Sequence, residues 1–97
     1  MEHRYSRRRK VRIPVRIERC GRPVAAAVLC DVSDAGLGLE VEGGLGFRPA
    51  DALSVRVPWE GRAVEIRGVV IHSAPGRLGL LVNGDLQFLS ARASRAA

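Results

Sequence analysis

The stretch VRIPVRI, residues 11–17, alternates apolar side chains at odd positions with arginine or proline at even positions. Successive side chains of a strand point to opposite faces of a sheet, so this pattern predicts a strand with one buried face. Pro14 has no backbone N–H to donate, which predicts an edge strand or a strand with a free side at that position.

Outward from this stretch, five more short apolar segments alternate with turn-forming residues. No strand–helix alternation is visible, so the chain is predicted to be all-β, and closure into a small barrel would remove exposed edges. A hairpin is predicted at Glu60-Gly61 and a bulge near Gly68. Asp85 to Ala93 is predicted to form a short C-terminal helix capped by Asp85. The further strands are predicted at residues 24–30, 37–41, 53–57, 63–72 and 78–82.

The length of 97 residues predicts one domain. We expect a basic, flexible segment at residues 1–10, a barrel at 11–84, and a short helix and tail at 85–97. No apolar run approaches the ~20 residues that cross a bilayer, and the charged N-terminus does not resemble a signal peptide. The sequence therefore predicts a cytoplasmic protein without a membrane span.

The net charge of +6 is concentrated at one end of the chain. Residues 1–22 hold nine of the 16 basic residues and only two acidic ones, whereas residues 23–97 are close to neutral. This asymmetry indicates an anionic partner, which is a nucleotide, a nucleic acid or a membrane surface. A solvated basic segment that aids solubility is the alternative.

The chain offers little to catalysis or to metal binding. A hairpin turn at Gly21 to Pro23 would separate the α-carbons of Cys20 and Cys30 by more than the ~7 Å that a disulfide tolerates, so both are predicted to be free. Two cysteines without nearby histidines also make a poor metal site. No P-loop and no catalytic triad pattern is visible. We therefore expect no enzyme activity, no metal and no cofactor.

Two arginines could bind an anion. Arg8 and Arg12 are four positions apart, so in an extended segment they project to the same side. Guanidinium groups bind phosphates, and the O6/N7 edge of guanine, through paired hydrogen bonds. Arginine-rich tails are common, however, so this spacing alone is a weak signal.

The segment DVSDAG, residues 31–36, carries a complementary set of groups. Asp31 can accept hydrogen bonds from the N1–H and N2–H₂ donors of guanine, and Ser33 can donate to a phosphate oxygen. Gly36 permits a positive φ and a close backbone approach. Alone, the segment is explained equally well as an ordinary turn between strands.

Together, the two segments resemble the PilZ family. RRKVR at residues 8–12 supplies R-x-x-x-R, and DVSDAG supplies D-x-S-x-x-G, in the family's order and about twenty residues apart. Residues 67–71 and 78–82 are also similar to the family's closing hairpin, so the resemblance covers roughly residues 4–84. Val82 stands where the family usually has an aromatic residue, which we interpret as a packing variation.

The resemblance implies a six-stranded antiparallel β-barrel followed by a helix, with cyclic di-GMP as the ligand. It implies that Arg8 and Arg12 contact guanine and phosphate, that Asp31 and Ser33 contact the opposite side of the ligand, and that Gly36 shapes the turn. Further candidates are Arg7, whose position favours a stacked pair of ligand molecules, and Arg9, Gly38 and Gly79.

The predicted function is that of a cyclic di-GMP receptor module, which orders its arginine-rich N-terminal segment on ligand binding and signals to an unidentified protein partner. One alternative is a small barrel that binds nucleic acid or an anionic surface through the same arginines. Nucleic acid is disfavoured because the chain has only four aromatic residues, and barrels that bind single strands usually stack bases on such rings. The other alternative, a PilZ-like interaction domain without a ligand, is disfavoured by the intact motif.

Overall fold

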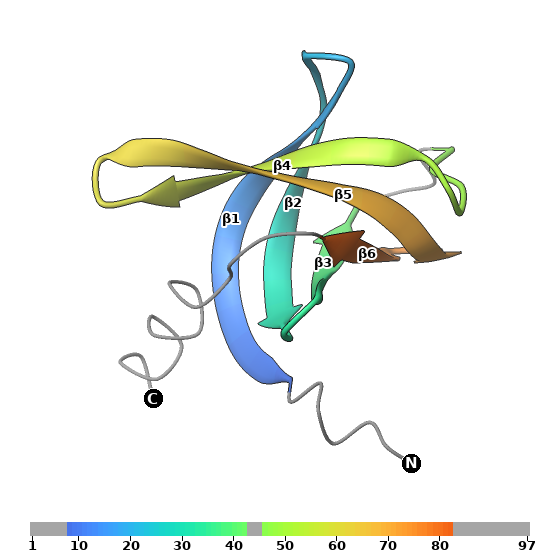
Figure 1. The fold of residues 1–97 in the computed structure, drawn as a ribbon, viewed down its shortest axis with the longest axis horizontal. Coiled ribbons are helices and arrows are strands. Elements are labelled where there is room, and N and C mark those ends of the chain that lie inside the picture. The colour runs from blue at the N-terminus through green and yellow to red at the C-terminus, as the bar shows by residue number, and fades with distance from the viewer. Residues whose placement is uncertain (1–7, 43–45, 83–97) are drawn as a thin grey trace.

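A computed structural model describes residues 8–42 and 46–82. Its six strands are antiparallel to their neighbours and close into a barrel in the order β1-β2-β3-β6-β5-β4, which confirms the predicted fold class (Figure 1). The helix predicted at 85–93 lies outside the described residues. No helix in the described ranges is long and apolar enough to cross a membrane. The strands are β1 (Arg9–Arg19), β2 (Arg22–Val32), β3 (Gly36–Val41), β4 (Ala52–Trp59), β5 (Arg62–Ala74) and β6 (Arg77–Val82).

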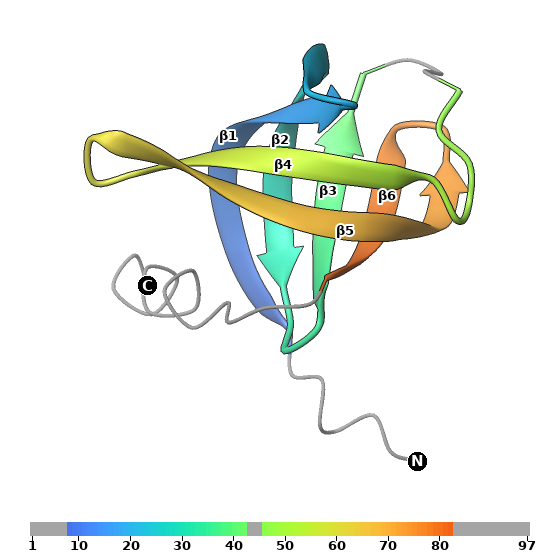
Figure 2. The same cartoon turned by 45° about the horizontal axis from the view of Figure 1, so that its top comes forward.

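The barrel is filled by aliphatic side chains from alternate positions of all six strands. On β1 the odd-numbered residues 13, 15 and 17 are buried and the even-numbered residues 12, 14 and 16 are exposed, as the alternation predicts. In Figure 2, β4 and β5 run across β1, β2 and β3, so side chains from both sets meet inside. The largest fully buried side chains are Ile17, Val32, Leu29, Leu39, Val55, Val57, Val70 and Leu80.

Two tight hairpins set the register of the long strands. The β4–β5 hairpin turns at Glu60-Gly61, where both residues have positive φ (50° and 81°), as predicted for this pair. The β1–β2 hairpin turns at Cys20-Gly21 (φ 53° and 78°), slightly before the predicted turn. Cys20 and Cys30 are both free, in agreement with the prediction.

β1 is not an edge strand, but it has a free side where Pro14 lies. β1 pairs with β2 from Arg9 to Arg19, whereas its ladder with β4 covers only Arg16 to Glu18. Pro14 therefore lies beyond the end of the β4 ladder, where its missing N–H costs no hydrogen bond to β4.

The bulge predicted near Gly68 is displaced. Gly68 pairs regularly with Leu53, and the β5–β6 register shifts between Val70 and His72 instead. Gly68 interrupts the apolar pattern for another reason. A Cβ at this position would lie 2.8 Å from Cγ1 of Val82 and 2.9 Å from the Leu81 carbonyl oxygen, so glycine permits β6 to pack closely.

Ile17→Val is expected to lower the free energy of unfolding by about 1 kcal/mol, because it deletes one methylene from a side chain with no solvent exposure. Urea unfolding followed by circular dichroism would measure this loss. Ile71→Val is the matched control, since Ile71 is 59% exposed and its truncation leaves no cavity. Equal shifts for both variants would contradict the assignment of Ile17 to the core.

Candidate functional site

A bulge at Cys30 places Asp31 on the outer side of the barrel. Leu29 and Val32 both point into the core, although they are three positions apart, so the inward–outward alternation slips by one residue between them. Both ladders of β2 shift their register at this point, against β1 and against β3. Bulges of this kind redirect a side chain locally. Here the redirected side chain is Asp31.

The carboxylate of Asp31 is buried and lies between two arginines. Its Oδ1 accepts a hydrogen bond from Nη1 of Arg8 at 2.8 Å, and its Oδ2 is 3.7 Å from Nη2 of Arg77. Only 9% of the Asp31 side chain is exposed, against 72% for Arg8 and 52% for Arg77. A buried carboxylate thus holds two accessible guanidinium groups at the surface.

Gly38 provides the space for this carboxylate. It is the register partner of Asp31 on β3, and a Cβ at position 38 would lie 2.7 Å from both carboxylate oxygens. Real Cβ atoms do not approach other atoms so closely. The absence of a side chain at Gly38 is therefore a condition for the observed position of Asp31.

The turn between β2 and β3 is closed by backbone hydrogen bonds. The N–H of Ser33 donates to the carbonyl of Gly36 at 2.9 Å, and the N–H of Val82 on β6 donates to the carbonyl of Ala35 at 2.8 Å. Of the two possibilities that glycine permits at position 36, a positive φ is not used. The role of Gly36 is the close approach, because a Cβ there would lie 3.1 Å from the carbonyl oxygen of Leu80.

A groove of about 490 Å³ runs over the outer face of β3 and β6 beside this turn. Gly38 and Gly79 are register partners in its floor; the Asp31 carboxylate covers Gly38, and no side chain rises from Gly79. Two strongly exposed aliphatic side chains, Ile71 (59%) and Leu81 (51%), also line it. The predicted site residues that line this groove are Arg8, Ser33, Gly36, Gly38 and Gly79.

The other predicted arginines do not join the groove. The guanidinium of Arg12 reaches toward β3, where its Nη1 is 3.8 Å from Oε1 of Glu40. Arg9 is exposed on β1 opposite Val32, and Arg7 lies outside the described residues. The register shift between Lys10 and Ile13 breaks the regular alternation between these two arginines, and of the two only Arg8 lines the groove.

Among the groove residues that sequence reasoning missed, Arg77, Ile71 and Leu81 contribute the charged and the strongly exposed aliphatic side chains. Arg77 begins β6 and is the register partner of Glu40 on β3. Its proximity to Asp31 follows from the order of strands in the barrel, which the sequence alone does not give. Ile71 lies at the β5 bulge, where the alternation that would mark it as exposed is broken. Leu81 follows the buried Leu80, so the alternation of β6 could have indicated that Leu81 faces solvent.

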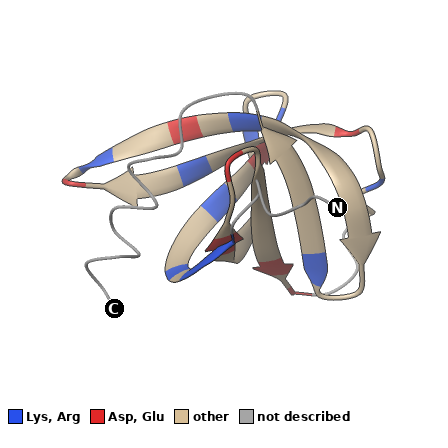
Figure 3. Cartoon of the chain, turned by 60° about the horizontal axis from the view of Figure 1, so that its bottom comes forward, with Lys and Arg blue, Asp and Glu red and all other residues tan. Residues whose placement is uncertain are grey.

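Within residues 8–42 and 46–82, the basic residues do not form one patch. Figure 3 shows Lys and Arg on several strands, with acidic residues among them. β1 carries its arginines from one end of the barrel to the other. Arg8 is near Asp31, whereas Arg19 pairs with Asp51 at 3.3 Å. The positive charge of the described N-terminal residues is therefore spread over separate surfaces of the barrel.

Cys30 is expected to react much more slowly than Cys20 with iodoacetamide near neutral pH. Burial raises the pKa of the Cys30 thiol, and the thiolate is the reactive form. The thiol also donates to the Gly38 carbonyl at 3.4 Å, whereas Cys20 is exposed at a hairpin tip. Peptide mass spectrometry over time would measure both rates. Faster labelling of Cys30 would contradict this geometry.

Comparisons with known proteins agree with the fold. The chain superposes on the structure of Bacillus subtilis Inhibitor of motility (MotI/DgrA) with a TM-score of 0.67 and 16% sequence identity. The match covers 99% of this chain and 52% of that one, so the chain spans about half the length of that protein. At this identity the likeness shows the fold alone. Comparison with curated protein sequences finds no match.

The family comparison covers almost the whole sequence. The PilZ domain matches residues 2–93, a range that includes the barrel, the groove and both motifs. The chain therefore belongs to the PilZ domain family, a family of cyclic di-GMP receptors.

Proposed function

We propose that this chain binds cyclic di-GMP in the groove over β3 and β6 and passes the signal to a protein partner. The observation that carries the proposal is the buried carboxylate of Asp31, held against Gly38 and paired with Arg8 and Arg77 at the edge of that groove. The arrangement joins the two halves of the sequence motif through a direct 2.8 Å hydrogen bond.

The groove suits the chemistry of this ligand. Cyclic di-GMP has two phosphates, which Arg8 and Arg77 can bind as charge-assisted donors. Its guanine rings are flat and apolar on both faces, and they can lie on the backbone of Gly79 beside the exposed Ile71. The Ser33 hydroxyl, close to Gly36, can donate to a phosphate oxygen.

Arg8 is the mobile part of the proposed mechanism. Its side chain is mostly exposed, so it can turn from Asp31 to the ligand and leave the carboxylate free to accept from a guanine edge. Six basic residues lie between Arg4 and Arg12, and their mutual repulsion falls when a dianion binds. The N-terminal segment then orders on the barrel, and the surface offered to a partner changes.

Titration calorimetry with cyclic di-GMP tests the proposal. Saturable binding at micromolar concentration is expected, and the stoichiometry decides between one ligand and a stacked pair near Arg7. Arg8→Ala should weaken binding about tenfold, which corresponds to the loss of one charge-assisted hydrogen bond. Arg67→Ala is the matched control, because Arg67 is 84% exposed on β5 and does not line the groove.

Absence of binding heat at tens of micromolar ligand, or equal weakening by both variants, would overturn the proposal. Single-stranded DNA serves as the competing ligand. Tight, sequence-independent binding of DNA with a steep salt dependence would instead support a nucleic-acid binder.

A further inference from the structure

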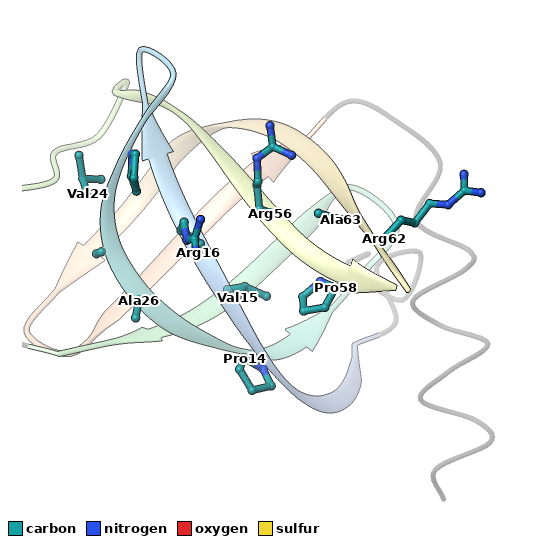
Figure 4. Close-up of a pocket in the computed structure, with 11 residues that line it drawn as sticks. Pro14, Val15, Arg16, Val24, Ala26, Arg56, Pro58, Arg62 and Ala63 are labelled. Atoms are coloured by element: carbon teal, nitrogen blue, oxygen red, sulfur yellow. The ribbon is translucent and has the colours of Figure 1, made fainter. Parts of the chain in front are cut away.

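A second groove lies at the seam between β1 and β4, away from Asp31 and its arginines. The two strands pair with each other only from Arg16 to Glu18 on β1, and the ladder between them ends at the Arg16–Arg56 pair. A groove of about 610 Å³ opens there, lined by β1, β2, β4 and the start of β5 (Figure 4). It shares no lining residue with the groove beside Ser33.

The floor of this seam groove is aliphatic. Pro14 and Pro58 lie where the strands separate, and Val24, which is 42% exposed, lines the groove from β2. Neither proline has an N–H to donate, so an added strand could not form a complete ladder here. A segment that docks in the seam groove is therefore recognised mainly through its side chains.

Arginines surround this apolar floor. Arg16 and Arg56 are direct register partners on neighbouring strands, and Arg62 lines the groove from the start of β5 (Figure 4). Like charges in directly opposed positions destabilise a sheet. Glu18 compensates Arg56, with Oε2 at 3.1 Å from its Nε.

Two of these arginines have no carboxylate partner among the residues that the structure describes. Within residues 8–42 and 46–82, neither Arg16 nor Arg62 forms an ion pair, and no acidic residue lines the seam groove. The seam groove thus combines the repulsion between the opposed Arg16 and Arg56 with an apolar floor that is exposed to solvent. A partner segment with acidic and apolar side chains would reduce both the repulsion and the apolar exposure.

We propose that the seam groove docks an acidic amphipathic segment of a partner protein. Its carboxylates would pair with Arg16 and Arg62, and its aliphatic side chains would cover Pro14, Val24 and Pro58. Charge complementarity favours this occupant over the chain's own residues 83–97, which carry two arginines and one aspartate. Nucleic acid is less suited, because no aromatic side chain lines the groove for base stacking.

The test uses the full chain and a fluorescein-labelled peptide of about twelve residues in which Glu and Leu alternate in helical register. Anisotropy is compared with that of a peptide with Lys in place of Glu, a peptide with Gly in place of Leu, and a single-stranded oligonucleotide. The Glu–Leu peptide is expected to bind best and to shift the amide resonances of Val24, Ala26 and Ala63. Arg16→Gln with Arg62→Gln should weaken this binding at least tenfold.

Arg48→Gln with Arg67→Gln is the matched control, since it removes the same charge from exposed positions outside both grooves. Equal weakening by both double variants, or stronger binding of the Lys peptide or the oligonucleotide, would overturn the proposal. The proposal would also be overturned if deletion of residues 83–97 caused the same shifts of the Val24, Ala26 and Ala63 resonances. Self-association of the chain that depends on Arg16 would overturn it as well. The Arg16 and Arg62 variant should keep cyclic di-GMP binding, which separates this test from that of the proposed function.

Discussion

Asp31→Asn is expected to weaken cyclic di-GMP binding by about 100-fold, because loss of one partner from a buried, charged hydrogen-bonded group costs several kcal/mol. The amide keeps the size of the side chain over Gly38 but has no charge. It also turns one acceptor oxygen into a donor that faces an arginine. Arg8 and Arg77 then lose the group that holds them beside the groove. Calorimetric titration of the variant would measure the change.

Asp34→Asn is the control for this substitution. Asp34 is three residues away, in the same turn, and exposed, and the same charge is removed. It is expected to change binding by less than about twofold, as substitutions away from specific contacts do. If the two variants lose affinity equally, net charge explains the effect and the buried carboxylate has no special role.

Most of the barrel follows from local sequence patterns. The alternation at 11–17 places three side chains in the core, and Glu60-Gly61 predicts the β4–β5 turn because glycine adopts a positive φ without strain. Such features depend on neighbours in the chain, so one sequence is sufficient to find them. The helix at 85–93 and the role of Arg7 stay predictions, because both lie outside the described residues.

The details of the site depend instead on contacts between distant strands. The bulge at Cys30 has no local marker, and it decides that Asp31 faces outward. Arg12 pairs with Glu40 across β2, which its spacing from Arg8 does not indicate. Arg77 reaches Asp31 because β3 lies between β2 and β6 in the barrel.

Those cross-strand contacts also change the expected mechanism. From sequence, Arg8 and Asp31 were two separate contacts to one ligand, whereas in the structure they contact each other. A ligand that binds Arg8 must compete with this ion pair. Because Asp31 is buried, the exchange requires that a guanine edge replace Arg8 as the hydrogen-bond donor to the carboxylate. The Arg8–Asp31 pair can thus hold the start of β1 on the barrel and still release Arg8 to a dianion.

Gly38→Ala is expected to lower the free energy of unfolding by about 2 kcal/mol, the usual range for an overpacked contact. Gly38 does not have a positive φ, so alanine is acceptable to its backbone. The cost is steric, since the new Cβ would lie 2.7 Å from both Asp31 oxygens and 2.8 Å from Cγ. Asp31 must then move away from Arg8, so cyclic di-GMP binding is expected to fall together with stability.

Gly79→Ala is the matched control, because Gly79 is the register partner of Gly38 and lines the same groove. A Cβ there would lie 3.4 Å from Cβ of His72, which is an ordinary contact, so its effect on stability should be small. Urea unfolding would compare the two variants. Asp31→Ala combined with Gly38→Ala removes the clashing carboxylate, and it should be more stable than Gly38→Ala alone without any recovery of binding. Equal losses for both glycines, or no recovery in the double variant, would show that Asp31 does not depend on the bare backbone of Gly38.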